Sequence, residues 1–341
     1  MSDDARGVRA LHVHDAAGVG RNLVDTANEM GQSWSMTGIP WYYRHEWTGI
    51  LKHPALRARP VVWDGTLALK SARADVVHFH TGGLSPHSRW VRTPWVLHFH
   101  GTDVRARQYD GWAPKLQYGV EHADAILYST PDLAPHVRNL TDRGQYFPVT
   151  IRVDQCATWE PRPNRVLFAS RWDDVKGAAL QIEVALRVRA AHPHVELVGL
   201  DWGTRAAEAA LAGITLVPKM APKHFRSWLA TASVVVGQMT SILSVSELEA
   251  LAIGVPLVTT ADRSSYPKLT RINGTRVESV TDGVIKALER PQAASRKQNG
   301  PGFVAQEHDA RVGVERLMQL YSSLIDSAKR RGSGDTGRAR P

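Results

Sequence analysis

The segment Arg165-Val-Leu-Phe-Ala-Ser-Arg-Trp-Asp-Asp-Val-Lys-Gly177 decides the fold class, because it joins three patterns in one short stretch. Residues 165–169 form an apolar run with the length of a buried β-strand. A polar turn with two cations follows, and residues 178–191 then show the spacing of an amphipathic helix. A strand that leads through a short turn into a helix is the repeating unit of a parallel sheet.

The same order of strand, turn and helix recurs on both sides of this segment. We predict further strands at residues 8–14, 75–80, 95–100, 125–129, 195–200, 214–218, 234–237 and 256–260. Strands that alternate with helices form parallel sheets with helices on both faces. The sequence therefore predicts an α/β fold with two Rossmann-like, doubly wound parallel-sheet domains that face a central cleft.

The pattern also divides the chain, and its length of 341 residues suits two domains. Residues 151–164 are rich in proline and polar residues without a helical period, so we predict a linker there. The N-terminal domain then covers residues 1–150, and the C-terminal domain covers residues 165–310. A last helix is expected at residues 311–328, and a disordered basic tail at residues 329–341.

The composition limits the classes of function. The formal net charge is +9, and five of these excess positive charges lie outside the tail. Such an excess favours anionic small molecules, or peripheral contact with an anionic membrane face. The sequence has no helix-turn-helix, ribonucleoprotein or zinc-finger signature, so we expect no nucleic-acid partner. The single cysteine, and the lack of a signal-peptide pattern or a long apolar run, predict a cytoplasmic protein.

The turn between residues 169 and 177 carries the strongest chemical signal. Arg171 and Lys176 stand five residues apart in a strand-to-helix turn. A guanidinium and an ammonium group together can hold a pyrophosphate without a metal. A second helix start near Ser244 would add backbone N–H donors for the same anion.

These segments together resemble the retaining GT-B glycosyltransferases of family four, also called glycosyltransferase group 1. The resemblance covers most of the chain, and the last two of its four motifs together are specific. The motifs are Gly18-Val-Gly-Arg21, His100-Gly101, Ser170-Arg171 to Lys176-Gly177, and Leu248-Glu-Ala-Leu-Ala-Ile-Gly-Val-Pro256. The resemblance implies a GT-B fold and the transfer of a sugar from a nucleotide-diphosphate sugar with retention of configuration. Uridine diphosphate is the expected nucleotide, and no cofactor or metal is expected.

The resemblance also implies roles for individual residues. Arg171 and Lys176 bind the donor pyrophosphate and stabilise the leaving group. Glu249 holds the ribose hydroxyls, and His100 lies near the transferred sugar. The glycine turn at Gly18 and Gly20 approaches the diphosphate from the N-terminal domain, which is the acceptor side.

One position departs from the family pattern. The family carries two glutamates separated by seven residues, and the position that precedes Glu249 by this spacing is Ser241. The first glutamate contacts the transferred sugar, so its replacement leaves two alternatives open: a catalytically impaired GT-B scaffold that binds sugar nucleotides, or a GT-B sugar-nucleotide epimerase. Glu247 is no substitute by spacing, because Ser244 to Glu247 has the pattern of a capping box.

Histidine pairs end three of the predicted strands, at residues 12–14, 78–80 and 98–100. Alternation along a strand points both members of a pair to one face. Three histidines from three strands would suit zinc, but no cysteine or carboxylate cluster accompanies them, so we expect no metal. For His78 and His98 we favour hydrogen-bonded core positions. For His80 and His100, at the strand ends, we favour sugar or acceptor recognition, and His100 is also a candidate general base.

The acceptor is the least determined part of the reaction. Asp103 either orients an acceptor hydroxyl or caps the following helix, and Ser241 is a further candidate sugar contact. The aromatic and basic run Trp41–Trp47 suits either sugar stacking or an ordinary packed loop. A sugar, a lipid-linked acceptor and another small molecule all stay open as the second substrate.

Overall fold

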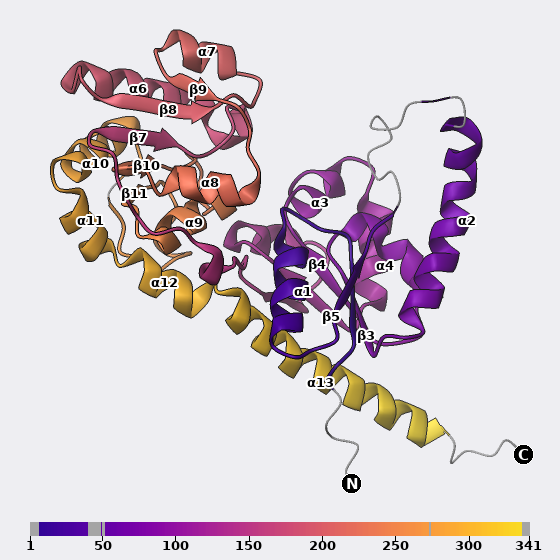
Figure 1. Cartoon of the computed structure of the whole chain (residues 1–341). Coiled ribbons are helices and arrows are strands. Elements are labelled where there is room, and N and C mark those ends of the chain that lie inside the picture. The colour runs from indigo at the N-terminus through magenta and orange to yellow at the C-terminus, as the bar shows by residue number, and fades with distance from the viewer. Residues whose placement is uncertain (1–6, 40–48, 50–51, 273, 336–341) are drawn as a thin grey trace, which may run out of the picture. The chain divides into compact units, whose positions relative to one another are not determined.

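The computed structural model of this chain describes residues 7–39, 49, 52–272 and 274–335. It divides into two compact units, which are considered separately here: residues 1–150 with 310–341, and residues 151–309. Figure 1 shows a sheet with helices against both of its faces in each unit. The run Trp41–Trp47, for which two interpretations were open, lies outside the described residues.

The N-terminal unit contains a six-stranded parallel sheet in the order β2-β1-β3-β4-β5-β6. Its strands are β1 (Ala10–Val13), β2 (Ser35–Thr37), β3 (Val76–Phe79), β4 (Trp95–Phe99), β5 (Ala125–Tyr128) and β6 (Gly144–Tyr146). Its α-helices are α1 (Val19–Glu29), α2 (Lys52–Ser71), α3 (Thr102–Arg105), α4 (Ala113–His122), α5 (Ala134–Arg138) and α13 (Ala310–Asp335). Short 3₁₀ segments are η3 (Gly82–Trp90), η4 (Arg107–Tyr109) and η5 (Pro131–Leu133).

The two faces of this sheet differ in chemistry. One face buries mainly apolar strand residues, such as Val77, Phe79 and Leu97. The other face packs against α1 and α13, and there the alternate strand positions are occupied by histidines as well as by aliphatic residues. Because strand residues alternate between faces, His12, His78 and His98 point toward α13. The first predicted pair is not kept, since β1 ends at Val13 and His14 adopts φ +70°.

The C-terminal unit contains a five-stranded parallel sheet in the order β11-β10-β7-β8-β9. Its strands are β7 (Arg165–Phe168), β8 (Glu196–Leu200), β9 (Thr215–Val217), β10 (Val234–Val236) and β11 (Leu257–Val258). Its helices are η6 (Val153–Gln155), η7 (Asp174–Lys176), α6 (Ala178–Ala191), α7 (Ala206–Leu211), α8 (Pro222–Leu229), α9 (Val245–Ile253), α10 (Val277–Glu289), α11 (Pro291–Gln298) and α12 (Gly300–Glu307). The prediction of two doubly wound parallel sheets is thus confirmed.

Three details differ from the sequence expectations. The edge strands β2 and β6 were not predicted, because they are short and partly exposed and lack an apolar run. Residues 151–164 follow the surface of the second unit, where Glu160 and Arg162 donate backbone hydrogen bonds to Ala230 and Thr231. Helix α13 continues to Asp335, beyond the expected end at residue 328, and packs on the N-terminal unit.

None of the described helices combines the length and the apolar composition that crossing a bilayer requires.

Candidate functional site

The turn after β7 places Arg171 and Lys176 at the carboxyl edge of the C-terminal sheet. Gly177 ends this turn with φ +68°, and a Cβ there would lie 2.6 Å from the Cβ of Met239, so the turn depends on glycine. The Arg171 guanidinium lies 2.9 Å from an Asp173 oxygen and 5.7 Å from the centre of the Trp202 ring. With 38% of its side chain exposed, Arg171 is anchored at one edge and accessible to an anion.

Lys176 is held by a residue that sequence reasoning missed. Its Nζ donates a hydrogen bond of 2.6 Å to Oε1 of Gln238, which is buried directly after β10. The Gln238 amide in turn donates to the carbonyl of Ile242 at 2.9 Å, and this fixes its orientation. The only sequence signal for Gln238 is its place after an apolar strand, where parallel sheets present ligand-binding residues.

The start of α9 confirms the predicted capping box. The backbone N–H and the hydroxyl of Ser244 both donate to Oε2 of Glu247 at 2.8 Å, and Thr259 donates to Oε1 at 2.9 Å. Burial raises the pKa of Glu247 to about 7, against the lowering effect of these hydrogen bonds and of the nearby Lys176. The Ser244 N–H is therefore engaged within the protein, and the N–H groups of the next residues stay at the open end of the helix.

Glu249 and Ser241 lie in different environments. Glu249 is buried, and its Oε1 accepts a hydrogen bond of 3.3 Å from Arg226, a partner that sequence reasoning missed because it lies 23 residues away. Burial raises the pKa of Glu249, and Arg226 opposes this shift. Ser241 is exposed in the loop that follows β10, and its backbone carbonyl accepts the N–H of Asp262.

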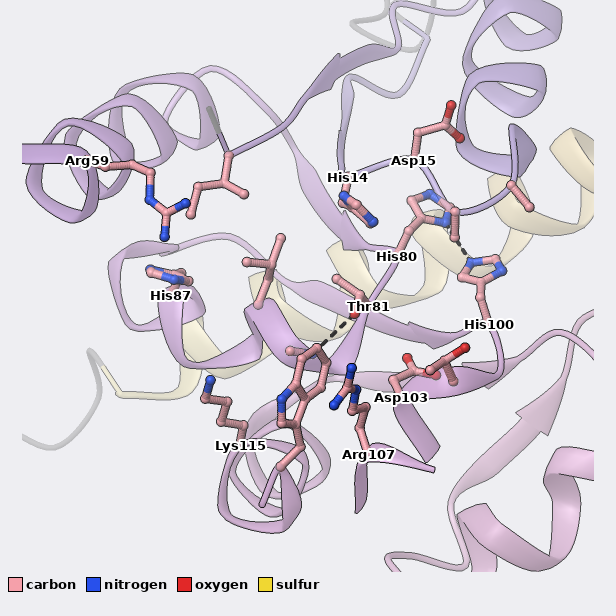
Figure 2. Close-up of a pocket in the computed structure, with 17 residues that line it drawn as sticks. His14, Asp15, Arg59, His80, Thr81, His87, His100, Asp103, Arg107 and Lys115 are labelled. Atoms are coloured by element: carbon pink, nitrogen blue, oxygen red, sulfur yellow. Dashed lines mark hydrogen bonds between the residues drawn. The ribbon is translucent and has the colours of Figure 1, made fainter. Parts of the chain in front are cut away.

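A pocket of about 690 Å³ occupies the carboxyl edge of the N-terminal sheet. Figure 2 shows His80 and His100 at one end of this pocket and Arg59, His87 and Lys115 at the other. The segments after β1, β3 and β4 supply most of its wall, and α2, η4 and α4 supply cations. Its volume lies within the range of about 300–1,000 Å³ that is typical of small-molecule sites.

The glycine turn at Gly18 and Gly20 does not line the pocket but packs behind it, at the carboxyl edge of the N-terminal sheet. Gly18 precedes α1 with φ +79°, which only glycine adopts at low cost. A Cβ on Gly20 would lie 3.2 Å from the ring of His80, so glycine allows the helix to approach the histidines. The structure thus brings Gly20 and His80 together.

The histidines form one continuous hydrogen-bonded chain with Tyr321 of α13. We call this set the histidine chain. Its links, in order, are His98 Nδ1 to His78 Nε2 (3.2 Å), His78 Nδ1 to Tyr321 OH (2.5 Å), Tyr321 OH to His12 Nε2 (3.3 Å), His12 Nδ1 to His80 Nε2 (2.8 Å), and His80 Nδ1 to His100 Nε2 (3.0 Å). One end, His100, lines the pocket, and the other end, His98 Nε2, is buried without a partner among the described residues.

Burial keeps the histidine chain neutral at pH 7. It lowers the pKa of His12 and of His100 to about 3, and it lowers the pKa of the other imidazoles well below the ordinary value, with a further contribution from neighbouring imidazoles. A group with so low a pKa is a weak base at neutral pH. His100 is therefore better suited to hydrogen bonding with a sugar hydroxyl than to general base catalysis.

The same imidazoles also have the spacing of metal ligands. The ligand atoms of His80, His98 and His100 lie within 4.8 Å of one another, and so do those of His12, His78 and His80. Three imidazoles make a possible zinc site. The hydrogen bonds of the histidine chain already engage most of these nitrogens, so they account for the arrangement without an ion. The absence of a functional metal stays a prediction.

Asp103 holds the turn that follows β4. Its carboxylate accepts backbone N–H groups from Gly101 at 3.0 Å, Val104 at 3.1 Å and Gly82 at 3.2 Å. Burial raises the pKa of Asp103, and these backbone donors oppose the shift. Asp103 lies inside the first turn of α3, whose N-cap is Gly101, so it holds the turn without being the predicted cap. It also lines the pocket, and its role toward an acceptor stays a prediction.

The residues of this pocket that sequence reasoning missed include Asp15, Arg59, Trp112 and Lys115. Of these four, only Asp15 could have been suspected from the sequence, because it lies two residues after the end of β1, where parallel sheets present ligand-binding residues. The other three lie on or next to helices and come from positions with no recognisable motif.

The comparisons with known proteins concern structure only. No protein-family model matches the chain, and no curated protein sequence matches it. Among solved structures, HepE from Anabaena, crystallised with UDP and glucose, is 11% identical with a TM-score of 0.68, over 93% of this chain and 100% of HepE. TarM from S. aureus, crystallised with UDP and α-GlcNAc-glycerol, is 13% identical with a TM-score of 0.58 over 72% of this chain. The chain spans about half of TarM, namely 55%.

A third similar structure bears on the alternative function. A UDP-N-acetylglucosamine 2-epimerase from Listeria monocytogenes, so described provisionally, is 14% identical with a TM-score of 0.60, over 94% of this chain and 97% of that protein. Similarity at this level of identity concerns the fold. Together with the two parallel sheets, it shows that the chain has the GT-B fold of two Rossmann-like domains.

Proposed function

We propose that the protein transfers a sugar from a UDP-sugar to an acceptor hydroxyl, with retention of configuration and without a metal. The observation that carries this proposal is the pair Arg171 and Lys176 at the carboxyl edge of the C-terminal sheet, beside Gln238. HepE and TarM, which share the fold, were both crystallised with UDP. The turn after β7 is thus the proposed diphosphate site.

The chemistry of the step explains the need for two cations. When the glycosidic bond breaks, negative charge develops on the nucleotide diphosphate and positive charge on the sugar ring. Arg171, Lys176 and the N–H groups at the start of α9 would oppose the first of these charges. Loss of one such contact typically costs about 3 kcal/mol of transition-state stabilisation. Gln238 contributes indirectly, since it restricts where the Lys176 ammonium can lie.

The proton of the acceptor hydroxyl needs a base. His100, with a pKa of about 3, is a poor one, so we propose that an oxygen of the departing diphosphate takes the proton on the same face as the attack. His100 would then bind a sugar hydroxyl through Nδ1, while His80 positions it, because both ring nitrogens of His80 already serve the histidine chain. Glu249 would bind the ribose through the oxygen that Arg226 does not engage.

Two alternatives keep specific support. The Listeria neighbour favours a sugar-nucleotide epimerase, which acts on the donor alone. The exposed Ser241, at the position of the first family glutamate, favours a scaffold that binds a sugar nucleotide without turnover. The retained cations at the diphosphate site favour the transferase over the scaffold.

The test measures UDP release from a panel of nucleotide sugars, with and without chelator. The variant Arg171→Ala/Lys176→Ala removes the proposed diphosphate contacts, and Lys286→Ala/Arg296→Ala removes two exposed cations of the same unit as a control. We expect slow, chelator-insensitive release from one donor, retained in the control and lost in the first variant. Isomerised donor as the product would establish the epimerase, and tight binding without turnover would establish the scaffold. Binding of no nucleotide would contradict all three.

A further inference from the structure

We propose that the pocket of the N-terminal unit binds an acceptor that carries a phosphate monoester, with the phosphate between Arg59 and Lys115. This inference rests on the proposed transferase function and specifies the class of its second substrate. It follows from the distribution of charge along the pocket, which is unequal at its two ends.

Cations gather at one end of the pocket from separate elements. Arg59 comes from α2 and Lys115 from α4, and Figure 2 shows both near His87. The Lys115 ammonium lies 5.5 Å from the centre of the Trp112 ring, and the Arg107 guanidinium lies 5.9 Å from it. Among the described residues, no carboxylate pairs with Lys115, so its charge is available to a ligand.

The described carboxylates near the pocket have partners other than Lys115, and Asp110 pairs with Arg107 at 3.0 Å. Asp64, behind His87, accepts hydrogen bonds from His87 Nδ1 at 2.6 Å and from Arg89 at 3.3 Å, so its charge is already matched. Asp103 is occupied by three backbone N–H groups, and Asp15 lies at the histidine end. Among the described residues, the ammonium of Lys115 is thus a positive charge at this end that no carboxylate matches and that a bound anion would offset.

A phosphate monoester fits this end better than a neutral group. It carries between about one and a half and two negative charges at pH 7 and three acceptor oxygens. A guanidinium and an ammonium are the side chains that bind such groups in proteins. At the opposite end, the neutral His100 offers a ring nitrogen, Nδ1, that the histidine chain does not use and that suits a hydroxyl. An acceptor held this way would present a hydroxyl at the histidine end and its phosphate at the cationic end.

The experiment measures binding to the full-length protein by titration calorimetry. Glucose and glucose 6-phosphate form a matched pair of probes that differ in the phosphate. Phosphatidylcholine vesicles with and without phosphatidylinositol 4-phosphate test a lipid source of the same group. The variant Arg59→Gln/Lys115→Gln removes the cationic end. Arg73→Gln/Arg92→Gln is the control, because these exposed cations precede β3 and β4 at the opposite edge of the sheet.

We expect glucose 6-phosphate to bind at least about tenfold more tightly than glucose, a difference that the first variant loses and the control keeps. Binding of the phosphoinositide vesicles alone, lost in the same variant, would support the phosphate site and assign it to a lipid acceptor. Equal binding of both sugars, or no binding of any phosphate probe, would overturn the proposal. UDP binding, measured in parallel, reports separately on the proposed transferase function, because it depends on the C-terminal unit.

Discussion

Acidification from pH 7 to pH 5 should destabilise the N-terminal unit selectively. His12, His78, His80 and His98 are fully buried, and burial lowers the pKa of each, that of His12 to about 3. In the unfolded chain the same imidazoles regain a pKa of about 6.5. Between these values the unfolded chain binds protons that the folded chain excludes. The free energy of unfolding therefore falls as the pH falls below about 6.5.

The size of the effect follows from the same pKa values. At pH 5, protonation of one exposed imidazole stabilises the unfolded chain by roughly 2 kcal/mol. His12, with a folded pKa of about 3, contributes this amount in full. The pKa values of His78, His80 and His98 are lowered in the same direction, so each adds to the loss. Since the total stability of a domain is only about 5–15 kcal/mol, we expect a measurable drop in the stability of the N-terminal unit at pH 5.

The C-terminal unit provides an internal control with the opposite sign. Burial raises the pKa of Glu247 to about 7, so the folded unit binds a proton that the unfolded chain releases. This unit should gain roughly 2 kcal/mol between pH 7 and pH 5 from that residue.

Native-state hydrogen exchange, analysed by peptide, would measure both units in one sample at pH 7, 6 and 5. Peptides from β3 and β4 should lose protection on acidification, after correction for the intrinsic exchange rate, and peptides from β7 and β10 should not. The variant His98→Leu removes one titrating group and should make the pH dependence of the first unit shallower. Equal unfolding free energies for β3 and β4 at pH 7 and pH 5 would refute the reasoning.

Three further predictions test single contacts. Tyr321→Phe removes the hydroxyl that bridges two buried imidazoles and should lower the free energy of urea unfolding by about 2–4 kcal/mol. The control Tyr109→Phe, at an exposed residue, should change it by less than about 0.5 kcal/mol. Similar losses in the two variants would contradict the hydrogen-bonded role of Tyr321. Gln238→Leu removes the hydrogen bond that Lys176 donates to Oε1 and should weaken UDP binding about tenfold by calorimetry. An unchanged affinity would show that Gln238 does not contribute to the site. Burial raises the pKa of the Cys156 thiol to about 12. At pH 8, iodoacetamide should therefore alkylate Cys156 far more slowly in the native protein than in the urea-unfolded protein. Equal rates would contradict the burial of this thiol.

The sequence predicts the central strands well because each is a short apolar run followed by a helix. Strands such as β3 and β7 were expected within one or two residues of their observed ends. The edge strands β2 and β6 have no such run, because one side of an edge strand has no neighbouring strand to bury it. Local periodicity also predicts a helix near residues 311–328 but cannot say that it packs on the first sheet, since that contact is between residues far apart in sequence.

The candidate sites divide in the same way. Arg171 and Lys176 were found because they share one turn, and the capping box was found because its residues are three apart. Gln238, which holds Lys176 from 62 residues away, had no comparable signal. Strand alternation predicts that the histidine pairs share a face, but the link through Tyr321 spans 243 residues and appears only in three dimensions.

The low pKa of the histidine chain also bears on the acceptor. If His80 and His100 were charged at pH 7, both ends of the pocket would attract an anion, and a phosphate-bearing acceptor would have two competing orientations. Because burial keeps both imidazoles neutral, the positive charge stays with Arg59 and Lys115 at the other end. The buried chain that stabilises the sheet would thereby also orient the acceptor, with its hydroxyl toward His100 and its phosphate away from it. On this reasoning, Tyr321→Phe, which leaves His80 and His100 buried and neutral, should lower the stability of the unit and leave the preference for glucose 6-phosphate over glucose unchanged.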